Sequence, residues 1–314
     1  MSRASQLALA FALLSSLASA ACTERASGLP TAPQPQPPTV SYVNEWGVKG
    51  TAPGQLQDPS AIAADTVGDV FVTNAGNAYV NKFGGSTGTP LLSLQEDGMN
   101  HPEAVTVDDG GAFYVGDPVR DSVFIFKPEG DKLKELRLKT KPSDENRISV
   151  AVGNDGLIHV LDSNAAKVFT FTPRAKLVQT WLPGAGSSGS AATRYDPIVG
   201  ASDGFFYVGT SAGSILKFTR EGQRVAEIHP ATNGVRWDPA SGFAIWSNHV
   251  FVMDADGHTL HVATLDGATT LDTDLAPQLG QGHRNAPMLA VSAQGDLLVL
   301  DPLECRILRY RVKL

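Results

Sequence analysis

The sequence predicts an all-β protein, a six-bladed β-propeller of four-stranded blades, and three observations support this prediction. A strand-turn-strand pattern recurs six times, at intervals of 43 to 48 residues. The chain contains 31 Gly and 20 Pro in 314 residues, enough to end many short strands. Beyond the first 20 residues no segment shows the 3.6-residue periodicity of an amphipathic helix. Four short strands in about 45 residues is typical of a propeller blade.

The second strand of each repeat gives the clearest signal, because it is an apolar run that ends in valine. These runs are Asp69–Val72, Ala112–Val115, Leu157–Val160, Phe205–Val208, His249–Val252 and Asp296–Val299. A tight turn and a third strand follow each run, at Tyr79–Phe83, Val123–Lys127, Lys167–Phe171, Ser214–Phe218, Thr259–Ala263 and Arg306–Tyr310. A more variable fourth strand comes next, for example at Leu133–Lys139, Lys176–Leu182 and Gln223–His229.

The two ends of the repeat region complement each other. The sixth repeat stops at Leu314, directly after its third strand, and therefore lacks a fourth. Val40–Trp46 reads as a strand that precedes the first repeat and has no blade of its own. We expect it to form the outer strand of the last blade, which closes the ring and covers an open edge. The predicted propeller spans residues 40–314.

The repeats resemble NHL repeats, and the first copy carries the match best. Its matching residues are Pro53-Gly54-Gln55-Leu56, Pro59, Gly68-Asp69-Val70-Phe71-Val72 and Lys82-Phe83. The resemblance covers residues 40–314 and implies a six-bladed propeller. It implies little about function, because one fold hosts many functions.

The first 39 residues predict export. Arg3, the apolar run Leu7–Leu14 and the small residues Ala18-Ser19-Ala20 give residues 1–20 the pattern of a signal peptide. Ser19-Ala20-Ala21-Cys22 resembles a bacterial lipobox, although Ser19 stands where that pattern prefers a bulky aliphatic residue. Two outcomes stay open: lipidation of Cys22 with tethering to the envelope, or cleavage after Ala20 with release to the periplasm or medium. Residues 21–39 are proline-rich and predict a tether.

The ligand site is expected at the channel mouth. In a propeller, the loops that lead into the innermost strands surround one end of the central channel, together with the turns after the second strands. The predicted ligand-binding residues on these lead-in loops are Asp58, His101, Glu103, Arg147 and Asp196. This rim is acidic and the net charge is −7, so a nucleic-acid partner is not expected. The sequence predicts a monomer that binds a protein, a peptide or a polar small molecule, and that meets a membrane only through a lipid anchor.

An acid or amide follows the second strand in five repeats. These residues are Asn74, Asp117, Asp162, Asp254 and Asp301. Such a ring could bind calcium. The alternative is that each side chain accepts backbone N–H groups and closes the turn that every blade repeats. We favour turn closure, because a feature shared by nearly all repeats belongs to the fold.

An enzymatic alternative rests on His101 and Glu103. A histidine and a carboxylate at a channel mouth could act as an acid/base pair or bind a metal. Six-bladed lyases and lactonases, which resemble this chain in blade number, use zinc or calcium there. The lead-in loops offer only one histidine, so we predict no cofactor and leave calcium or zinc as the alternative. Cys305 is expected to be a lone thiol rather than the partner of Cys22 in a disulfide.

Overall fold

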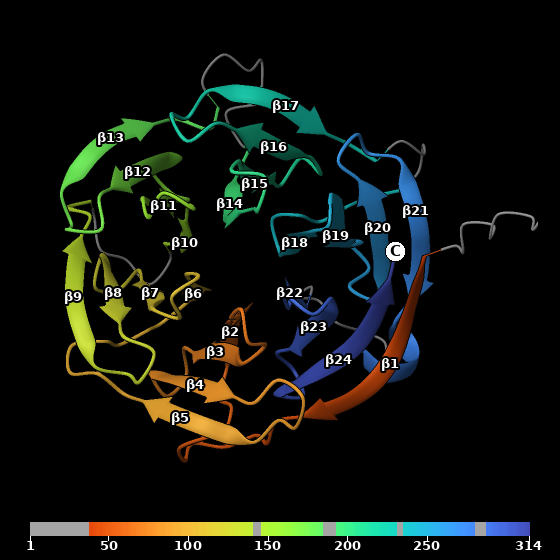
Figure 1. Cartoon of the computed structure of the whole chain (residues 1–314), viewed down its shortest axis with the longest axis horizontal. Helices are drawn as coiled ribbons and strands as arrows, with labels where there is room; N and C mark the ends of the chain where they lie inside the picture. Colours follow the sequence, from red (N-terminus) through yellow and green to blue (C-terminus); the bar gives the residue numbers. More distant parts are fainter. Residues whose placement is uncertain (1–37, 141–145, 185–192, 231–234, 280–286) are drawn as a thin grey trace, which may run out of the picture. The chain divides into compact units, whose positions relative to one another are not determined.

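The computed structural model describes residues 38–140, 146–184, 193–230, 235–279 and 287–314. Within these ranges, the chain forms six antiparallel four-stranded sheets arranged as the blades of a ring (Figure 1). The predicted fold class is therefore confirmed.

In blades one to five the strands run from the channel outwards in chain order, and in blade six the outermost strand is β1. Blades one to three comprise β2 (Pro59–Ala64), β3 (Val70–Asn74), β4 (Tyr79–Phe83) and β5 (Pro90–Leu94); β6 (Ala104–Val107), β7 (Phe113–Asp117), β8 (Ser122–Phe126) and β9 (Lys132–Arg137); β10 (Ile148–Val152), β11 (Ile158–Asp162), β12 (Lys167–Phe171) and β13 (Leu177–Trp181). Blades four to six comprise β14 (Tyr195–Gly200), β15 (Phe206–Thr210), β16 (Ile215–Phe218) and β17 (Arg224–Ile228); β18 (Phe243–Trp246), β19 (His249–Met253), β20 (Thr259–Thr264) and β21 (Thr269–Asp274); β22 (Met288–Val291), β23 (Asp296–Asp301), β24 (Arg306–Lys313) and β1 (Thr39–Trp46). A four-residue helix, α1 (Ala276–Leu279), follows β21.

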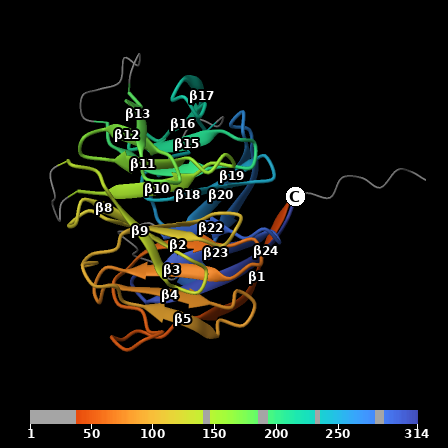
Figure 2. The ribbon, with the colours of Figure 1, turned by 60° about the vertical axis from the view of Figure 1, so that its left-hand side comes forward.

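The ring closes between the two ends of the described chain, as predicted. β1 pairs antiparallel with β24, from Thr39 opposite Lys313 to Trp46 opposite Ile307. Figure 2 shows the two strands side by side. The pairing explains why β24 continues to Lys313, three residues beyond the predicted third strand: its last residues find partners on β1. Closure leaves blade six with a full set of four strands.

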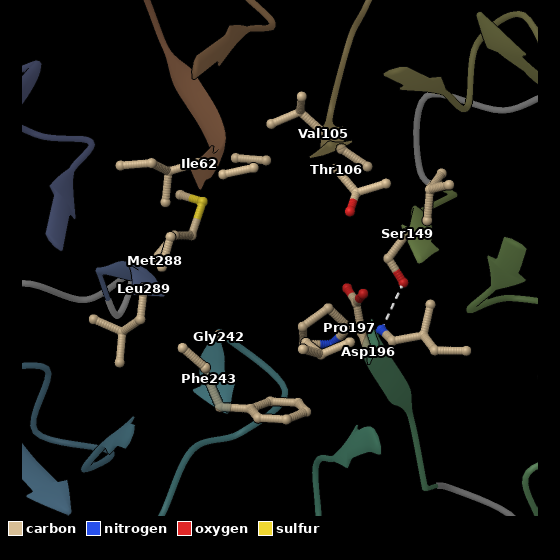
Figure 3. Close-up of a pocket in the computed structure, with 18 of the residues that line it drawn as sticks. Ile62, Val105, Thr106, Ser149, Asp196, Pro197, Gly242, Phe243, Met288 and Leu289 are labelled. Carbon is tan, nitrogen blue, oxygen red and sulfur yellow. Dashed lines mark hydrogen bonds between the residues drawn. The ribbon is translucent and has the colours of Figure 1, made fainter. Parts of the chain in front are cut away.

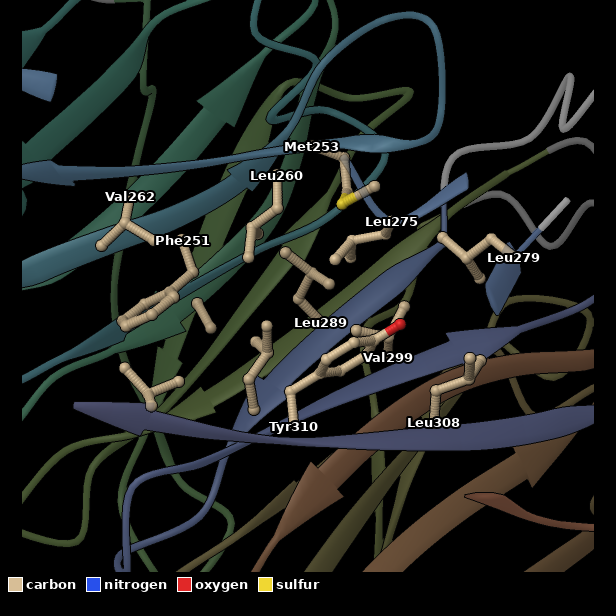
Figure 4. Close-up of a cluster of buried hydrophobic side chains, with 13 residues drawn as sticks. Phe251, Met253, Leu260, Val262, Leu275, Leu279, Leu289, Val299, Leu308 and Tyr310 are labelled. Atoms are coloured by element: carbon tan, nitrogen blue, oxygen red, sulfur yellow. The ribbon is translucent and has the colours of Figure 1, made fainter. Parts of the chain in front are cut away.

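The core is divided among the six seams between neighbouring blades. Side chains alternate along a strand, so Val70 and Val72 of β3 pack towards blade six whereas Phe71 packs towards blade two. Both faces of β3 are buried, which is why its sequence is almost continuously apolar. Figure 4 shows the seam between blades five and six, where Phe251 and Leu260 meet Leu308 and Tyr310.

Hydrogen bonds fix the channel mouth by tying the lead-in loops of blades one, three and four to a turn of the same blade. The N–H of Ala75 donates to Asp58 O at 3.1 Å in blade one, and that of Ser163 donates to Arg147 O at 3.0 Å in blade three. In blade four, the N–H of Ser211 donates to Arg194 O at 2.9 Å. The lead-in loops and the turns after the second strands therefore lie at the same end of the ring.

Candidate functional site

A cavity of about 250 Å³ occupies the channel between the six innermost strands. Residues from β2, β6, β10, β14, β18 and β22 line it, so every blade contributes (Figure 3). Glu103 and Arg147 lie at its mouth on the lead-in loops of blades two and three, and Asp196, predicted on a lead-in loop, is the second residue of β14 in blade four. Three residues more than 40 positions apart in sequence are thus brought to one cavity by the ring.

Asp58, the remaining lead-in residue of blade one, does not join this group. Its side chain is exposed and does not line the cavity, and its backbone adopts a φ of 50°. Its structural contribution is the carbonyl oxygen that accepts the N–H of Ala75. The residues that the ring does bring together, His101, Glu103, Arg147 and Asp196, are called the mouth cluster below.

Asp196 is the most buried member of the mouth cluster. Its side chain is 10% exposed, and Arg147 Nε lies 3.4 Å from its Oδ2. Burial raises the pKa of Asp196, and the Arg147 guanidinium opposes that rise only in part. The close approach of neighbouring backbone holds the residue in place: a Cβ at Gly209 would lie 2.6 Å from the Asp196 carbonyl oxygen, so only glycine fits there.

Glu103 faces the same space from blade two. Nδ1 of His101 lies 3.0 Å from its Oε1. Its second oxygen, Oε2, is buried and has no hydrogen-bond partner. Burial raises the pKa of Glu103, whereas the nearby His101 and Arg147 lower it. Because Asp196 adds to the rise, the two carboxyls act on each other across the mouth.

The position of His101 depends on a residue that the sequence assigned to turn closure. Asp117 at the end of β7 is fully buried, and its Oδ2 accepts the backbone N–H groups of Asn100 at 2.6 Å and His101 at 2.9 Å. Its Oδ1 accepts the N–H of Arg120 at 3.1 Å, which closes the turn. The same side chain therefore closes the turn and holds the lead-in loop that carries His101. The sequence showed the first role but not the second.

Two of the other acids after the second strands also close their turns. Asp162 Oδ1 accepts the N–H of Ala165 at 2.9 Å, and Asp301 Oδ1 accepts the N–H of Leu303 at 3.1 Å. Asn74 Oδ1 accepts the N–H of Gln57 at 3.2 Å. All three side chains are buried. Asp162 and Asp301 therefore confirm the turn-closure interpretation, whereas Asn74 holds the lead-in loop. Asp254 differs: it is half-buried, its Oδ1 accepts the N–H of the next residue, Ala255, at 2.6 Å, and its Oδ2 lies 3.4 Å from His261 Nε2.

Blade five contains a histidine-carboxylate cluster that sequence reasoning did not assemble. His261 is 3% exposed; its Nδ1 lies 2.7 Å from Asp272 Oδ1 and its Nε2 lies 3.4 Å from Asp254 Oδ2. The signal was the register, because His261 on β20 stands directly opposite Asp272 on β21. These residues do not line the channel. In the part of the chain that the structure describes, no three His, Cys, Asp or Glu side chains gather closely enough to hold a metal ion.

The predicted export signals lie outside the described residues. This applies to the signal peptide at residues 1–20, to Cys22, and to residues 21–37 of the predicted tether. Cys305 is buried and unpaired among the residues that are described. No helix in the described ranges has the length and apolar character needed to cross a membrane.

No protein-family model and no curated protein matches the sequence. Solved structures do share the fold. A streptogramin B lyase structure has a TM-score of 0.62 at 14% identity, over 88% of this chain and 98% of that chain. Two structures of virginiamycin B lyase from Staphylococcus aureus also match. One, a catalytically inactive variant with quinupristin, has a TM-score of 0.57 at 11% identity, over 81% of this chain and 80% of its own. The other, a selenomethionine-substituted form, has a TM-score of 0.58 at 11% identity, over 87% and 99%. At such identities the likeness shows the fold alone.

Proposed function

We propose that this six-bladed propeller is an exported, NHL-type binding protein that recognises a peptide, a protein segment or a polar small molecule at its channel mouth. The observation that carries the proposal is the mouth cluster, in which Glu103 and Asp196, both largely buried, face a cavity of about 250 Å³. Buried carboxyl groups are costly unless a partner satisfies them. A cavity with a few converging polar groups is the usual form of a ligand site.

The charge of the chain narrows the class of ligand. The net charge is −7, and the two carboxyls of the mouth cluster lie beside Arg147 and His101, with Arg194 also acting on Asp196. A nucleic acid needs a basic surface. The proposed ligand is therefore neutral-polar or cationic where it meets the mouth.

A binding screen with matched variants tests the proposal. Small polar compounds and short peptides would be screened by thermal shift against the wild-type protein. They would also be screened against Glu103→Gln/Asp196→Asn, which removes both carboxylates and keeps the side-chain shapes. Compounds that bind at the mouth should stabilise the wild type and lose that effect in the double variant. Glu129→Gln, an exposed change on the β8–β9 turn, is the control. If every stabilising compound acts equally on both proteins, the mouth is not the site.

A second candidate is an enzyme that works at the same mouth. It is favoured by the 3.0 Å separation of His101 Nδ1 and Glu103 Oε1, which suits a histidine general base oriented by a carboxylate. Known propellers of this fold include streptogramin B lyases. Incubating the protein with quinupristin and following the loss of intact compound by mass spectrometry would test this activity, with His101→Ala as the control. Turnover that His101→Ala abolishes would favour the enzyme over the binding protein.

We also propose that the mature chain is tethered to a bacterial envelope through a lipid on Cys22. The support is the sequence alone: an apolar signal segment, small residues before Cys22, and a proline-rich stretch before the first strand. Such an arrangement would hold the propeller off a membrane surface.

A further inference from the structure

We propose that the channel mouth recognises the carbonyl oxygen of a neutral molecule through Arg147, and that the apolar group attached to this carbonyl lies in the channel. This inference rests on the proposed binding function and specifies the class of its ligand. Three observations carry it: the mouth holds charges of both signs, the Arg147 guanidinium has unused donors, and the channel wall below the mouth is apolar.

The charged groups at the mouth favour a neutral head group. Glu103 and Asp196 have side chains that are 17% and 10% exposed. His101 and Arg147 act on Glu103, and Arg194 acts on Asp196 together with Arg147. A cationic head group would be placed beside two arginines and an anionic one beside two largely buried carboxyls, so like charges would repel either ion. A neutral head group meets neither repulsion.

Arg147 supplies the hydrogen-bond donors. Its side chain is 47% exposed, lines the cavity, and reaches Asp196 through Nε, 3.4 Å from Oδ2. In the described part of the chain, neither terminal nitrogen, Nη1 or Nη2, has a hydrogen-bond partner. A guanidinium donates through a planar fork of N–H groups and cannot accept. The neutral group that matches it is therefore a strong acceptor, such as the carbonyl of an amide.

The channel wall below the mouth suits an apolar group. The charged residues that line the cavity all belong to the mouth cluster. Two hydroxyls of the wall already bond within the protein: Ser60 Oγ donates to Pro102 O at 2.7 Å, and Ser149 Oγ accepts the N–H of Ile198 at 2.9 Å. Figure 3 shows the remaining space, of about 250 Å³, surrounded by the Thr106 hydroxyl and by the apolar side chains of Ile62, Val105, Phe243, Met288 and Leu289. Such a wall binds alkyl groups through the hydrophobic effect.

Three probes that share one stem test the head group. Isovaleramide, isovalerate and isopentylamine carry the same branched alkyl group with a neutral, an anionic and a cationic head at neutral pH. Isovaleramide should bind the wild-type protein at least about tenfold more tightly than either ion, as measured by NMR titration of the isotope-labelled protein. Equal or tighter binding of either ion overturns the neutral assignment and leaves a ligand site at the mouth. Absence of binding by isovaleramide overturns the carbonyl assignment.

The length of the stem tests whether it enters the channel. Each methylene group buried in an apolar site strengthens binding by roughly fourfold. Butanamide, which is two methylene groups longer than acetamide, should therefore bind at least about tenfold more tightly. Equal affinities of the two amides would place the stem outside the channel and overturn the inference.

Variants of Arg147 test the donor. Arg147→Ala removes the guanidinium and should weaken isovaleramide by about tenfold or more. Arg147→Lys keeps a cation opposite Asp196 but loses the planar fork, so it should weaken binding by several-fold even if the alanine variant fails to fold. Arg174→Ala, on the exposed β12–β13 turn, is the matched control and should leave the affinity unaltered. Wild-type affinity in either Arg147 variant overturns the role of Arg147.

The same chemistry has two sources, a free amide or a peptide carbonyl beside an apolar side chain. N-acetyl-leucine methylamide presents the isobutyl group and carbonyl of isovaleramide within a peptide unit. Tighter binding of the leucine derivative would indicate a peptide source, and tighter binding of isovaleramide would indicate a small-molecule source. Loss of the proposed binding function would show instead in the thermal-shift screen, as compounds of every chemistry acting equally on the wild type and the double variant.

Discussion

His159 tests how burial affects the pH dependence of stability, because its buried site disfavours the charged imidazolium. The residue lies on β11, is fully buried, and packs against Phe206 with ring centroids 3.9 Å apart and the rings tilted by 40°. Its Nδ1 lies 3.1 Å from Thr170 Oγ1, whereas Nε2 is buried without a hydrogen-bond partner. Burial lowers the pKa of His159 from 6.5 to about 4, against a smaller opposing effect of Asp155.

The sign of the effect follows from linkage. Since the native pKa lies below the unfolded value, the unfolded chain takes up the proton first as the pH falls. The stability associated with the neutral histidine is complete above about pH 6.5 and is lost progressively as the pH falls towards 4. A shift from 6.5 to about 4 is worth about 3 kcal/mol in the free energy of unfolding.

The assay is urea denaturation of the wild type and of His159→Phe at several pH values between 7 and 4.5. The difference in free energy of unfolding between the two proteins should change by roughly 2.5 kcal/mol over that range, in favour of the variant at low pH. Other titrating groups are common to both proteins and cancel. Val160→Ala, on the same strand, removes buried methyl groups but keeps the histidine, so its destabilisation should not vary with pH. A pH-independent difference between wild type and His159→Phe would refute the reasoning.

Three further predictions concern the ring closure, the anchor and the mouth. Deleting Val40–Trp46 exposes the edge of β24, so it should lower the urea midpoint and cause aggregation that size-exclusion chromatography detects. Deleting Ser27–Pro38 should change neither property. Equal stability of the two truncated proteins would contradict the ring closure. Metabolic labelling with palmitate should mark the wild type and not Cys22→Ser, and a mature chain beginning at Ala21 with an unmodified cysteine would contradict the anchor. Burial raises the pKa of Glu103 above the ordinary 4.5, so a cationic compound that binds at the mouth in the thermal-shift screen should lose affinity as the pH drops through that raised value. Titration calorimetry would measure this affinity, and a value that stays constant down to pH 4.5 would rule out a charged Glu103 as part of the binding site.

Most of the fold could be predicted because the pattern of apolar residues and turns that specifies each blade lies within one short stretch of sequence. Each blade repeats the same alternation within about 45 residues, and both faces of a strand such as β3 are buried at seams, which gives runs such as Val70–Val72. The closure was also predictable, since a missing fourth strand at one end matched an extra strand at the other. The turn acids followed from their recurrence, and Asp162 and Asp301 do close turns.

The sequence could predict which residues are candidates for the site, but not which of them lie together at the cavity. Glu103 and Asp196 stand two residues before Val105 and Ile198, which pair with Val115 and Val208, whereas Asp58 stands four residues before Ile62, which pairs with Val72. Asp58 is exposed and away from the cavity, while the other two side chains are largely buried and line it. The repeat register therefore separates Asp58 from the other two residues, but the burial of each side chain depends on which blades meet and on the direction of that side chain.

The sequence by itself determined the number of blades, their strands and the way the ring closes, because these follow from short-range patterns of apolar residues and turns. Only the tertiary structure decided which side chains share the channel mouth, that Glu103 Oε2 lacks a donor, and that His159 is sealed from water. These properties arise from contacts between residues far apart in the chain. Their energies depend on distance and exposure to solvent, which no single repeat encodes.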